Sequence, residues 1–207
     1  MSTLSPLTAQ DLLATLYGDV QGYALSSAGR SRIARESDPA FTYGEVTPEA
    51  MEFMMNQVQP KEGEVFYDLG AGTGKGVMFS AFLAPFAKAV GIELLDELWA
   101  SANDTLAKYE QNVKPNLPLE KQMQKIEFRK GDIFVEDISD GDVVFSHCTC
   151  FDDELMAKLT KQCETLKSGA RVITVTKGIN SPLFTSLGTM PFRMAWGDAT
   201  VCFYQKI

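Results

Sequence analysis

Strand-like and helix-like segments alternate along most of the chain, and this alternation limits the fold more than any other feature. Short runs rich in β-branched and aromatic residues predict strands, whereas apolar residues three or four positions apart predict helices. The predicted strands cover residues 64–69, 87–94, 125–130, 142–147 and 170–176. The predicted helices cover residues 48–58, 76–86, 96–111 and 152–167. Strands that alternate with helices are joined by right-handed crossovers, so the sequence predicts an α/β fold with a mostly parallel sheet covered on both faces.

The C-terminal residues leave this alternation. Two β-rich runs, at 192–196 and 199–205, flank Gly197-Asp198, a dipeptide that favours a tight turn. We therefore expect an antiparallel hairpin that completes the sheet at one edge. In such sheets a ligand binds beyond the carboxyl ends of the strands, so functional residues are expected in the loops after the first four strands.

Residues 1–46 differ from the rest of the chain. Leucines at helical spacing predict a helix over residues 9–17, and the residues after it are rich in small side chains. Three arginines lie in the same stretch: Arg30, Arg32 and Arg35. They either form a solvated face or contact an anionic partner. We interpret residues 1–46 as a helical, partly mobile extension that acts as a lid, and residues 47–207 as the domain itself.

Composition restricts the class of protein. Apolar residues make up 45% of the 207 residues, which is enough for one globular core. The net charge of −8 disfavours direct binding of nucleic acid, whose phosphates attract basic surfaces. Four cysteines are too few for a secreted disulfide scaffold, and the longest apolar stretch, residues 77–87, is too short to span a membrane. We expect a soluble protein inside the cell, in the cytoplasm or the nucleus.

A glycine-rich loop follows the first predicted strand and opens a helix. It reads Asp68-Leu69-Gly70-Ala71-Gly72-Thr73-Gly74-Lys75-Gly76. Glycines let a backbone approach a ligand closely, and the start of a helix offers free N–H groups. A P-loop is excluded, because Gly76 rather than Ser or Thr follows Lys75. The dinucleotide fingerprint is excluded as well, because it requires a glycine at position 75.

The glycine spacing, with Asp68 at the end of the strand, resembles the first motif of class I S-adenosylmethionine-dependent methyltransferases. This resemblance implies a Rossmann-like fold with a seven-stranded sheet and S-adenosyl-L-methionine as cofactor. It implies that Asp68 lies near the cofactor's ammonium group and that Glu93 holds the ribose hydroxyls. It places Asp132 near the adenine amino group and Ile133 on the adenine ring. The cofactor-binding residues that it implies are Asp68, Gly70, Gly72, Gly74, Glu93, Asp132 and Ile133.

A second resemblance involves an earlier loop, Phe41-Thr42-Tyr43-Gly44-Glu45. The loop is similar to the Tyr-Gly-Glu loop of the non-SET histone-lysine methyltransferases, the disruptor-of-telomeric-silencing family. The similarity extends over residues 41–207, through VFYDLGAGTGKGV, AVGIEL, RKGDIF and DVVFSHCTCFDDEL. In that family the loop folds over the methionine moiety of the cofactor, which implies that Glu45 binds there. The residues implied at the methyl-transfer site are Tyr43, Cys148, Phe151, Trp196 and Phe203.

His147 is the single histidine of the sequence, and it matches an asparagine of the family's motif. Together with Cys148 and Cys150 it lacks the second pair of ligands that zinc sites use, so no metal is expected. Three roles stay open for His147: a partly buried structural side chain with its hydrogen bonds satisfied, the lip of an acceptor pocket, or a general base.

The second resemblance implies transfer of a methyl group to a lysine of a protein. A lysine must be neutral to attack, although its pKa in water is about 10.4, and an apolar channel lowers that pKa by desolvation. The acidic surface would suit a basic protein as substrate. Two alternatives remain at this point, a methyltransferase for a small amine or other metabolite and a cofactor-binding module without catalysis.

Overall fold

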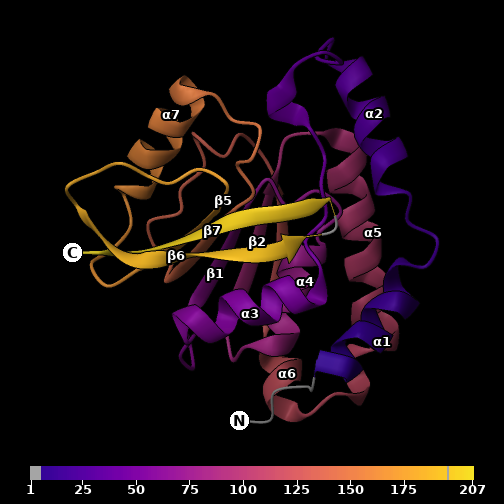
Figure 1. The fold of residues 1–207 in the computed structure, drawn as a ribbon. Helices are drawn as coiled ribbons and strands as arrows, with labels where there is room; N and C mark the ends of the chain where they lie inside the picture. The colour runs from indigo at the N-terminus through magenta and orange to yellow at the C-terminus, as the bar shows by residue number, and fades with distance from the viewer. Residues whose placement is uncertain (1–5, 195) are drawn as a thin grey trace.

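The computed structural model describes residues 6–194 and 196–207, which form a three-layer α/β fold (Figure 1). The strands are β1 (Val65–Leu69), β2 (Lys88–Glu93), β3 (Lys125–Lys130), β4 (Val143–Ser146), β5 (Arg171–Val175), β6 (Phe184–Met194) and β7 (Gly197–Lys206). The α-helices are α1 (Pro6–Tyr17), α2 (Gly22–Arg32), α3 (Pro48–Val58), α4 (Lys75–Leu83), α5 (Asp96–Asn112), α6 (Leu119–Met123) and α7 (Asp153–Cys163). Two single turns of 3-10 helix are η1 (Pro39–Phe41) and η2 (Lys114–Asn116).

One mixed sheet contains the seven described strands, in the order β3-β2-β1-β4-β5-β7-β6. The first five strands in this order are parallel to one another, whereas β7 pairs antiparallel with both β5 and β6. The strand order reverses between β1 and β4, and such a switch point is where α/β sheets bind their ligands. The predicted α/β fold, with a mostly parallel sheet and a closing hairpin, is confirmed.

Two apolar clusters, one on each face of the sheet, hold the layers together. Helices α1, α3, α4 and α5 cover one face, and α7 covers the other (Figure 1). Side chains alternate along β1, so Phe66 enters the first cluster while Tyr67 and Leu69 enter the second. Asp68 is only 4% exposed, so a carboxylate lies at the end of a strand that is otherwise apolar and buried. Within the described helices, none has the length and apolar character needed to cross a membrane.

The first strand of the C-terminal hairpin is longer than predicted. β6 begins at Phe184 rather than at residue 192. Gly188 (φ 120°) follows a bulge, and Pro191 lies on the edge strand of the sheet, where a residue without an N–H is tolerated. Because glycine and proline interrupt the usual strand pattern, they hide the first half of β6 in the sequence.

The turn of the hairpin also differs from the prediction. Met194 pairs with Gly197, and Asp198 already pairs with Arg193, so the predicted turn at Gly197-Asp198 is wrong. The chain reverses before Gly197, and Trp196 lies in the turn. Residue 195, in the first predicted β-rich run, is outside the described residues.

Helix α1 packs onto the same apolar core as the rest of the chain, and α2 lies beside α5 (Figure 1). Helix α1 buries Leu13, Leu16 and Tyr17, each with 4–6% of its surface exposed, against α3 and α4. Helix α2 lies along α5, and Arg32 forms an ion pair with Glu97 at 2.8 Å. The predicted helical character is confirmed for residues 6–17 and 22–32, whereas the role of residues 1–46 as a lid stays a prediction.

Replacing Leu16 by alanine is expected to lower the free energy of unfolding by about 2–4 kcal/mol, because it removes a buried side chain and leaves a cavity under α1. Urea denaturation followed by circular dichroism measures this change. Leu119→Ala is the control, since Leu119 is 69% exposed and its loss should change stability by less than about 0.5 kcal/mol. Equal effects of the two substitutions would contradict the packing of α1.

Candidate cofactor-binding site

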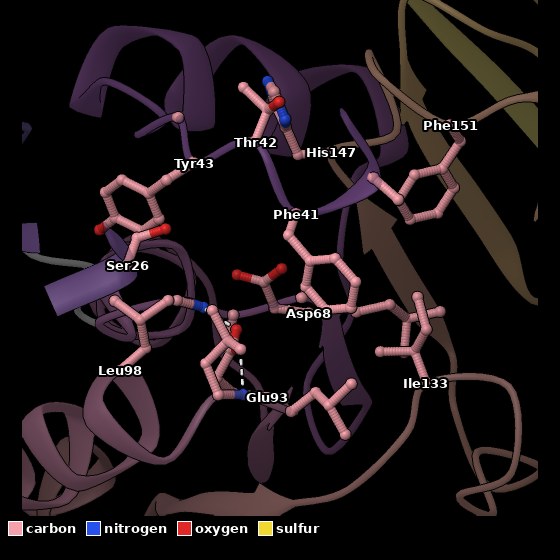
Figure 2. Close-up of a pocket in the computed structure, with 18 of the residues that line it drawn as sticks. Ser26, Phe41, Thr42, Tyr43, Asp68, Glu93, Leu98, Ile133, His147 and Phe151 are labelled. Atoms are coloured by element: carbon pink, nitrogen blue, oxygen red, sulfur yellow. Dashed lines mark hydrogen bonds between the residues drawn. The ribbon is translucent and has the colours of Figure 1, made fainter. Parts of the chain in front are cut away.

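A cavity of about 630 Å³ lies at the carboxyl ends of β1, β2 and β4 (Figure 2). Its walls come from segments far apart in the sequence, including α2, the loop before α3, the β1–α4 loop and the start of α7. The predicted site residues that line it are Tyr43, Glu45, Asp68, Gly70, Gly72, Glu93, Asp132, Ile133 and Phe151. The predicted site residues outside its lining are Gly74, Cys148, Trp196 and Phe203.

The β1–α4 loop brings backbone to the cavity wall. Gly70 and Gly72 have φ values of 92° and 57°, in the left-handed region that favours glycine. A Cβ on Gly72 would lie 2.8 Å from the Tyr43 ring, whereas a Cβ on Gly70 would meet no atom within 4 Å. Gly72 therefore lets Tyr43 lie against the loop, and the space above Gly70 is open to a ligand. Gly74 lies against the Phe128 ring instead, so it shapes the loop from outside the cavity.

Glu93, at the end of β2, holds the glycine loop through two backbone hydrogen bonds. The Gly72 N–H donates to Oε2 and the Leu95 N–H donates to Oε1, each at 2.8 Å. Burial raises the pKa of Glu93, and these backbone donors oppose the rise. A carboxylate fixed in this way at a cavity wall is a strong acceptor for ligand hydroxyl groups.

Asp68 points into the same cavity from β1 but lacks a partner (Figure 2). Within the described part of the chain, no hydrogen-bond donor reaches its carboxylate, although the residue is only 4% exposed. Burial is the main cause that raises the pKa of Asp68 to about 8, and repulsion from Glu93 adds to it. A buried carboxylate without a donor fits a ligand with a positively charged group, because such a group would supply the missing partner.

Because of this raised pKa, affinity for a ligand with an ammonium group is expected to increase about fivefold from pH 7 to pH 8. The ligand favours the ionised carboxylate, whereas the ligand-free protein holds a proton on Asp68 at pH 7. Titration calorimetry with S-adenosylhomocysteine at several pH values measures the change. Asp68→Asn is the control and should bind weakly with no such slope. A wild-type affinity independent of pH would contradict an ammonium partner for Asp68.

The same raised pKa of Asp68 makes the ligand-free protein less stable, rather than more, as the pH rises. In the unfolded chain Asp68 ionises near its ordinary pKa of 3.8, whereas in the folded protein it ionises near 8. Between these values the folded state binds the additional proton, so the contribution of Asp68 to stability falls as the pH rises from 4 to 8.

A hydrogen-bonded clamp joins the Tyr-Gly-Glu loop to the glycine loop. The Tyr43 hydroxyl donates to Glu45 Oε1 at 2.8 Å and lies 3.1 Å from Thr73 Oγ1. Lys75 Nζ donates to Glu45 Oε2 at 2.6 Å, and the Tyr17 hydroxyl donates to the Thr73 carbonyl at 3.1 Å. Burial raises the pKa of Tyr43, so its hydroxyl stays protonated. The sequence prediction placed Glu45 on the cofactor; in the structure its carboxylate lines the cavity and holds Tyr43 and Lys75, and its contact with the cofactor stays a prediction.

The rings of His147 and Trp196 form an aromatic pair beside Gly44 of the Tyr-Gly-Glu loop. Their rings meet edge to face, with centroids 4.4 Å apart, and both lie about 3.4 Å from the Cβ position of Gly44. Burial lowers the pKa of His147 to about 4, so the imidazole is neutral at pH 7. Its Nε2 is buried and finds no hydrogen-bond partner in the described chain. Of the three roles left open by the sequence, a fully hydrogen-bonded structural histidine does not fit this geometry.

Comparison with known proteins identifies the family. The family model for the histone methylation protein DOT1 matches residues 34–185. The chain belongs to this family. A histone-lysine N-methyltransferase, H3 lysine-79 specific, from Caenorhabditis elegans is 31% identical over 155 residues, which cover 72% of this chain and 16% of that protein. The chain thus spans about a sixth of the length of this curated relative.

Solved structures of methyltransferases resemble the fold of this chain. An RNA methyltransferase from Salinibacter ruber in complex with S-adenosyl-L-homocysteine gives a TM-score of 0.59 at 23% identity, covering 78% of this chain and 93% of that one. TrmN from Thermus thermophilus gives a TM-score of 0.63 at 14% identity, and the match covers 82% of this chain and 52% of TrmN. These similarities confirm the Rossmann-like methyltransferase fold that the sequence predicted.

Three residues predicted at the methyl-transfer site have defined packing partners in this DOT1-family chain, and only Phe151 of them lines the cavity. Phe151 packs against Phe134 at 6.2 Å between ring centroids, and Figure 2 shows it on the Ile133 side of Asp68, away from Tyr43. Cys148 is fully buried, and its Sγ donates to the Val175 carbonyl at 3.3 Å. Phe203 is 3% exposed and packs against Phe53 of α3. Cys148 and Phe203 are therefore core residues in this structure.

Several lining residues were missed by sequence reasoning. They are Ser26, Phe41, Thr73, Lys75, Leu98 and Phe134. Thr73 and Lys75 lie within the glycine motif, and Phe41 lies beside the Tyr-Gly-Glu motif. The sequence therefore indicated that these residues are near the site, but it did not show that their side chains line the cavity. Ser26 had no signal in the sequence, because it reaches the cavity through the packing of α2. Residues 6–194 and 196–207 contain no group of three or more side chains able to hold a metal ion.

Proposed function

We propose that this chain is an S-adenosylmethionine-dependent methyltransferase that acts on a lysine side chain of a protein. The observation that carries the proposal is the DOT1-family match over residues 34–185, which contains the cavity's acids at the ends of successive strands. The partnerless carboxylate of Asp68 agrees with a ligand that carries an ammonium group.

The cavity residues fit the cofactor in three parts. Asp68 would hold the ammonium group, and Glu93 would accept hydrogen bonds from the ribose hydroxyls. Asp132 and Ile133, which follow β3, would face the adenine group, and Phe151 extends the apolar wall at that end. We propose the adenine end of the cavity, rather than the lysine channel, as the place of Phe151.

The cofactor, when bound, supplies a methyl group on a positively charged sulfur that an amine attacks in line. The chain's task is then to position a neutral amine at about 3 Å from that methyl group. The neutral His147 imidazole has an acceptor nitrogen free, so it would hold an N–H of the amine at the lip of the site. The apolar face of Trp196, 38% exposed, would line the approach.

A basic segment of a protein is the substrate that the charge of the chain favours. The net charge of the chain is −8, although at the cavity Asp38 and Glu154 are paired with Arg35 and Lys158. Attraction between this acidic surface and a basic segment would raise the rate of encounter. The relatives' names specify lysine 79 of histone H3, so a histone, and with it a site of action inside the cell, belongs to this proposal.

Incubation of the purified protein with tritiated S-adenosylmethionine tests the proposal. Separate reactions contain histone octamers, a protein lysate or a protein-free metabolite extract. Label on a protein, mapped to lysine by mass spectrometry, is the expected result. Label confined to the metabolite extract would instead indicate a small-molecule methyltransferase, and cofactor binding without transfer in any reaction would indicate a non-catalytic module.

A further inference from the structure

A buried hydroxyl from outside the family match lies in the cavity wall. Ser26 belongs to α2, ahead of the matched residues 34–185. It is 1% exposed, it lines the cavity, and its Oγ has no hydrogen-bond partner within the described chain. A serine inside a helix can bond to the carbonyl four positions earlier, but Ser26 does not do so. A buried hydroxyl without a partner is unfavourable, so a missing partner is expected at this position.

Helix α2 is held in place closely enough to fix this hydroxyl. Gly22, Ser26 and Gly29 lie on one face of the helix, at helical spacing. A Cβ on Gly22 would lie 2.7 Å from Glu45 Oε1, and one on Gly29 would lie 2.9 Å from Glu97 Oε2. Only glycine therefore allows α2 to approach the Tyr-Gly-Glu loop at one end and α5 at the other. Between these two contacts the Ser26 side chain faces the cavity.

The surroundings of Ser26 indicate the kind of partner it lacks. Figure 2 shows it between Tyr43 and Leu98, with its oxygen directed toward the middle of the cavity. The Tyr43 hydroxyl is already engaged with Glu45 and Thr73, and Leu98 has no polar group. A ligand in the cavity is thus the available partner. A serine hydroxyl can donate a hydrogen bond to a ligand oxygen without adding charge.

We propose that Ser26 is a cofactor-binding residue whose Oγ donates a hydrogen bond to an oxygen of S-adenosylmethionine, either its carboxylate or its ribose. This assignment rests on the proposed function. Helix α2 is then part of the cofactor site. The predicted extension contributes a binding group directly, in addition to any movement it makes as a lid.

Substitution of Ser26 by alanine tests the assignment. We expect the dissociation constant for S-adenosylhomocysteine to increase roughly threefold to tenfold, because one neutral hydrogen bond is lost. Ser27→Ala is the matched control: the same change on the same helix, at an exposed side chain, should leave affinity within about twofold. Alanine is favourable in helices, so both variants should fold. Calorimetry measures the affinities.

The stability of the ligand-free variants separates binding from a structural role. Removing a hydroxyl without a partner is expected to leave the thermal midpoint of the ligand-free Ser26→Ala protein unchanged or higher, while the increase caused by ligand becomes smaller. A lower midpoint with unchanged affinity would overturn the assignment. Binding of 5′-methylthioadenosine, which has ribose but no carboxylate, distinguishes the two oxygens: Ser26→Ala weakens it only if the ribose is the acceptor.

These measurements distinguish failure of the proposed function from failure of the role of Ser26. If the unaltered protein does not bind S-adenosylhomocysteine, the proposed function falls together with the role of Ser26. If the unaltered protein binds and Ser26→Ala binds equally well, only the role of Ser26 is overturned. Deleting α2 is a poorer test, because the preceding helix buries Leu13, Leu16 and Tyr17 in the core and its loss would disturb the fold.

Discussion

Replacing Trp196 by alanine is expected to reduce methyl transfer about 100-fold while leaving the affinity for S-adenosylhomocysteine within about twofold. The Trp196 ring orients His147 edge to face at 4.4 Å and covers Gly44, but it does not line the cavity that contains Asp68 and Glu93. Its loss should therefore misplace the acceptor and spare the cofactor. Initial rates with radiolabelled cofactor, together with calorimetry, measure the two quantities.

Leu187→Ala provides the control for Trp196. Leu187 lies on β6 of the same hairpin and is 49% exposed, far enough from the turn to have no contact with the acceptor side. Its replacement should leave both rate and affinity unchanged. A Trp196→Ala protein with normal transfer would show that the hairpin is no part of the acceptor channel. Equal losses of transfer and cofactor binding would point to a disturbed fold instead.

Replacing Glu93 by alanine is expected to weaken binding of S-adenosylmethionine by at least about tenfold. The ribose hydroxyls lose a charged acceptor, and the N–H groups of Gly72 and Leu95 lose the oxygens that hold them. The glycine loop then becomes less ordered in the ligand-free protein. Calorimetry measures the affinity, and hydrogen exchange at Gly72 measures the order of the loop.

Glu127→Ala is the matched control for Glu93. Glu127 lies on the adjacent strand β3, and its carboxylate pairs with Arg129 and Lys88 at the surface. Its removal should change cofactor affinity by less than about twofold, because surface ion pairs contribute little. If Glu93→Ala and Glu127→Ala bind the cofactor equally well, the ribose assignment is wrong.

The cofactor side of the cavity could be predicted because its residues follow a simple rule. In a parallel sheet the carboxyl ends of neighbouring strands meet, so Asp68, Glu93 and Asp132 were expected near one another without knowledge of any packing angle. All three line the cavity. Their position follows from their place at the carboxyl ends of parallel strands, and the resemblance to class I methyltransferases singled out these three acids.

The acceptor side could not be predicted equally well, because it depends on register and packing. Phe203 pairs with Ile173 and faces α3, and a sequence pattern does not show which face of the last strand a residue occupies. Cys148 lies only one position after His147, yet it enters the core while His147 reaches the cavity. The roles predicted for Phe151 and Trp196 stay predictions.

Two segments outside the family match, α2 and the C-terminal turn, lie against adjacent residues of the Tyr-Gly-Glu loop. Gly22 of α2 lies against Tyr43, and Trp196 of the C-terminal turn lies against Gly44. Under the proposed function, α2 would lie beside the cofactor and the C-terminal turn beside the acceptor, while the central region carries the cofactor chemistry. In evolutionary terms, substrate choice and cofactor affinity could then change separately. Chimaeras that exchange one terminus at a time between family members would show such a division of labour.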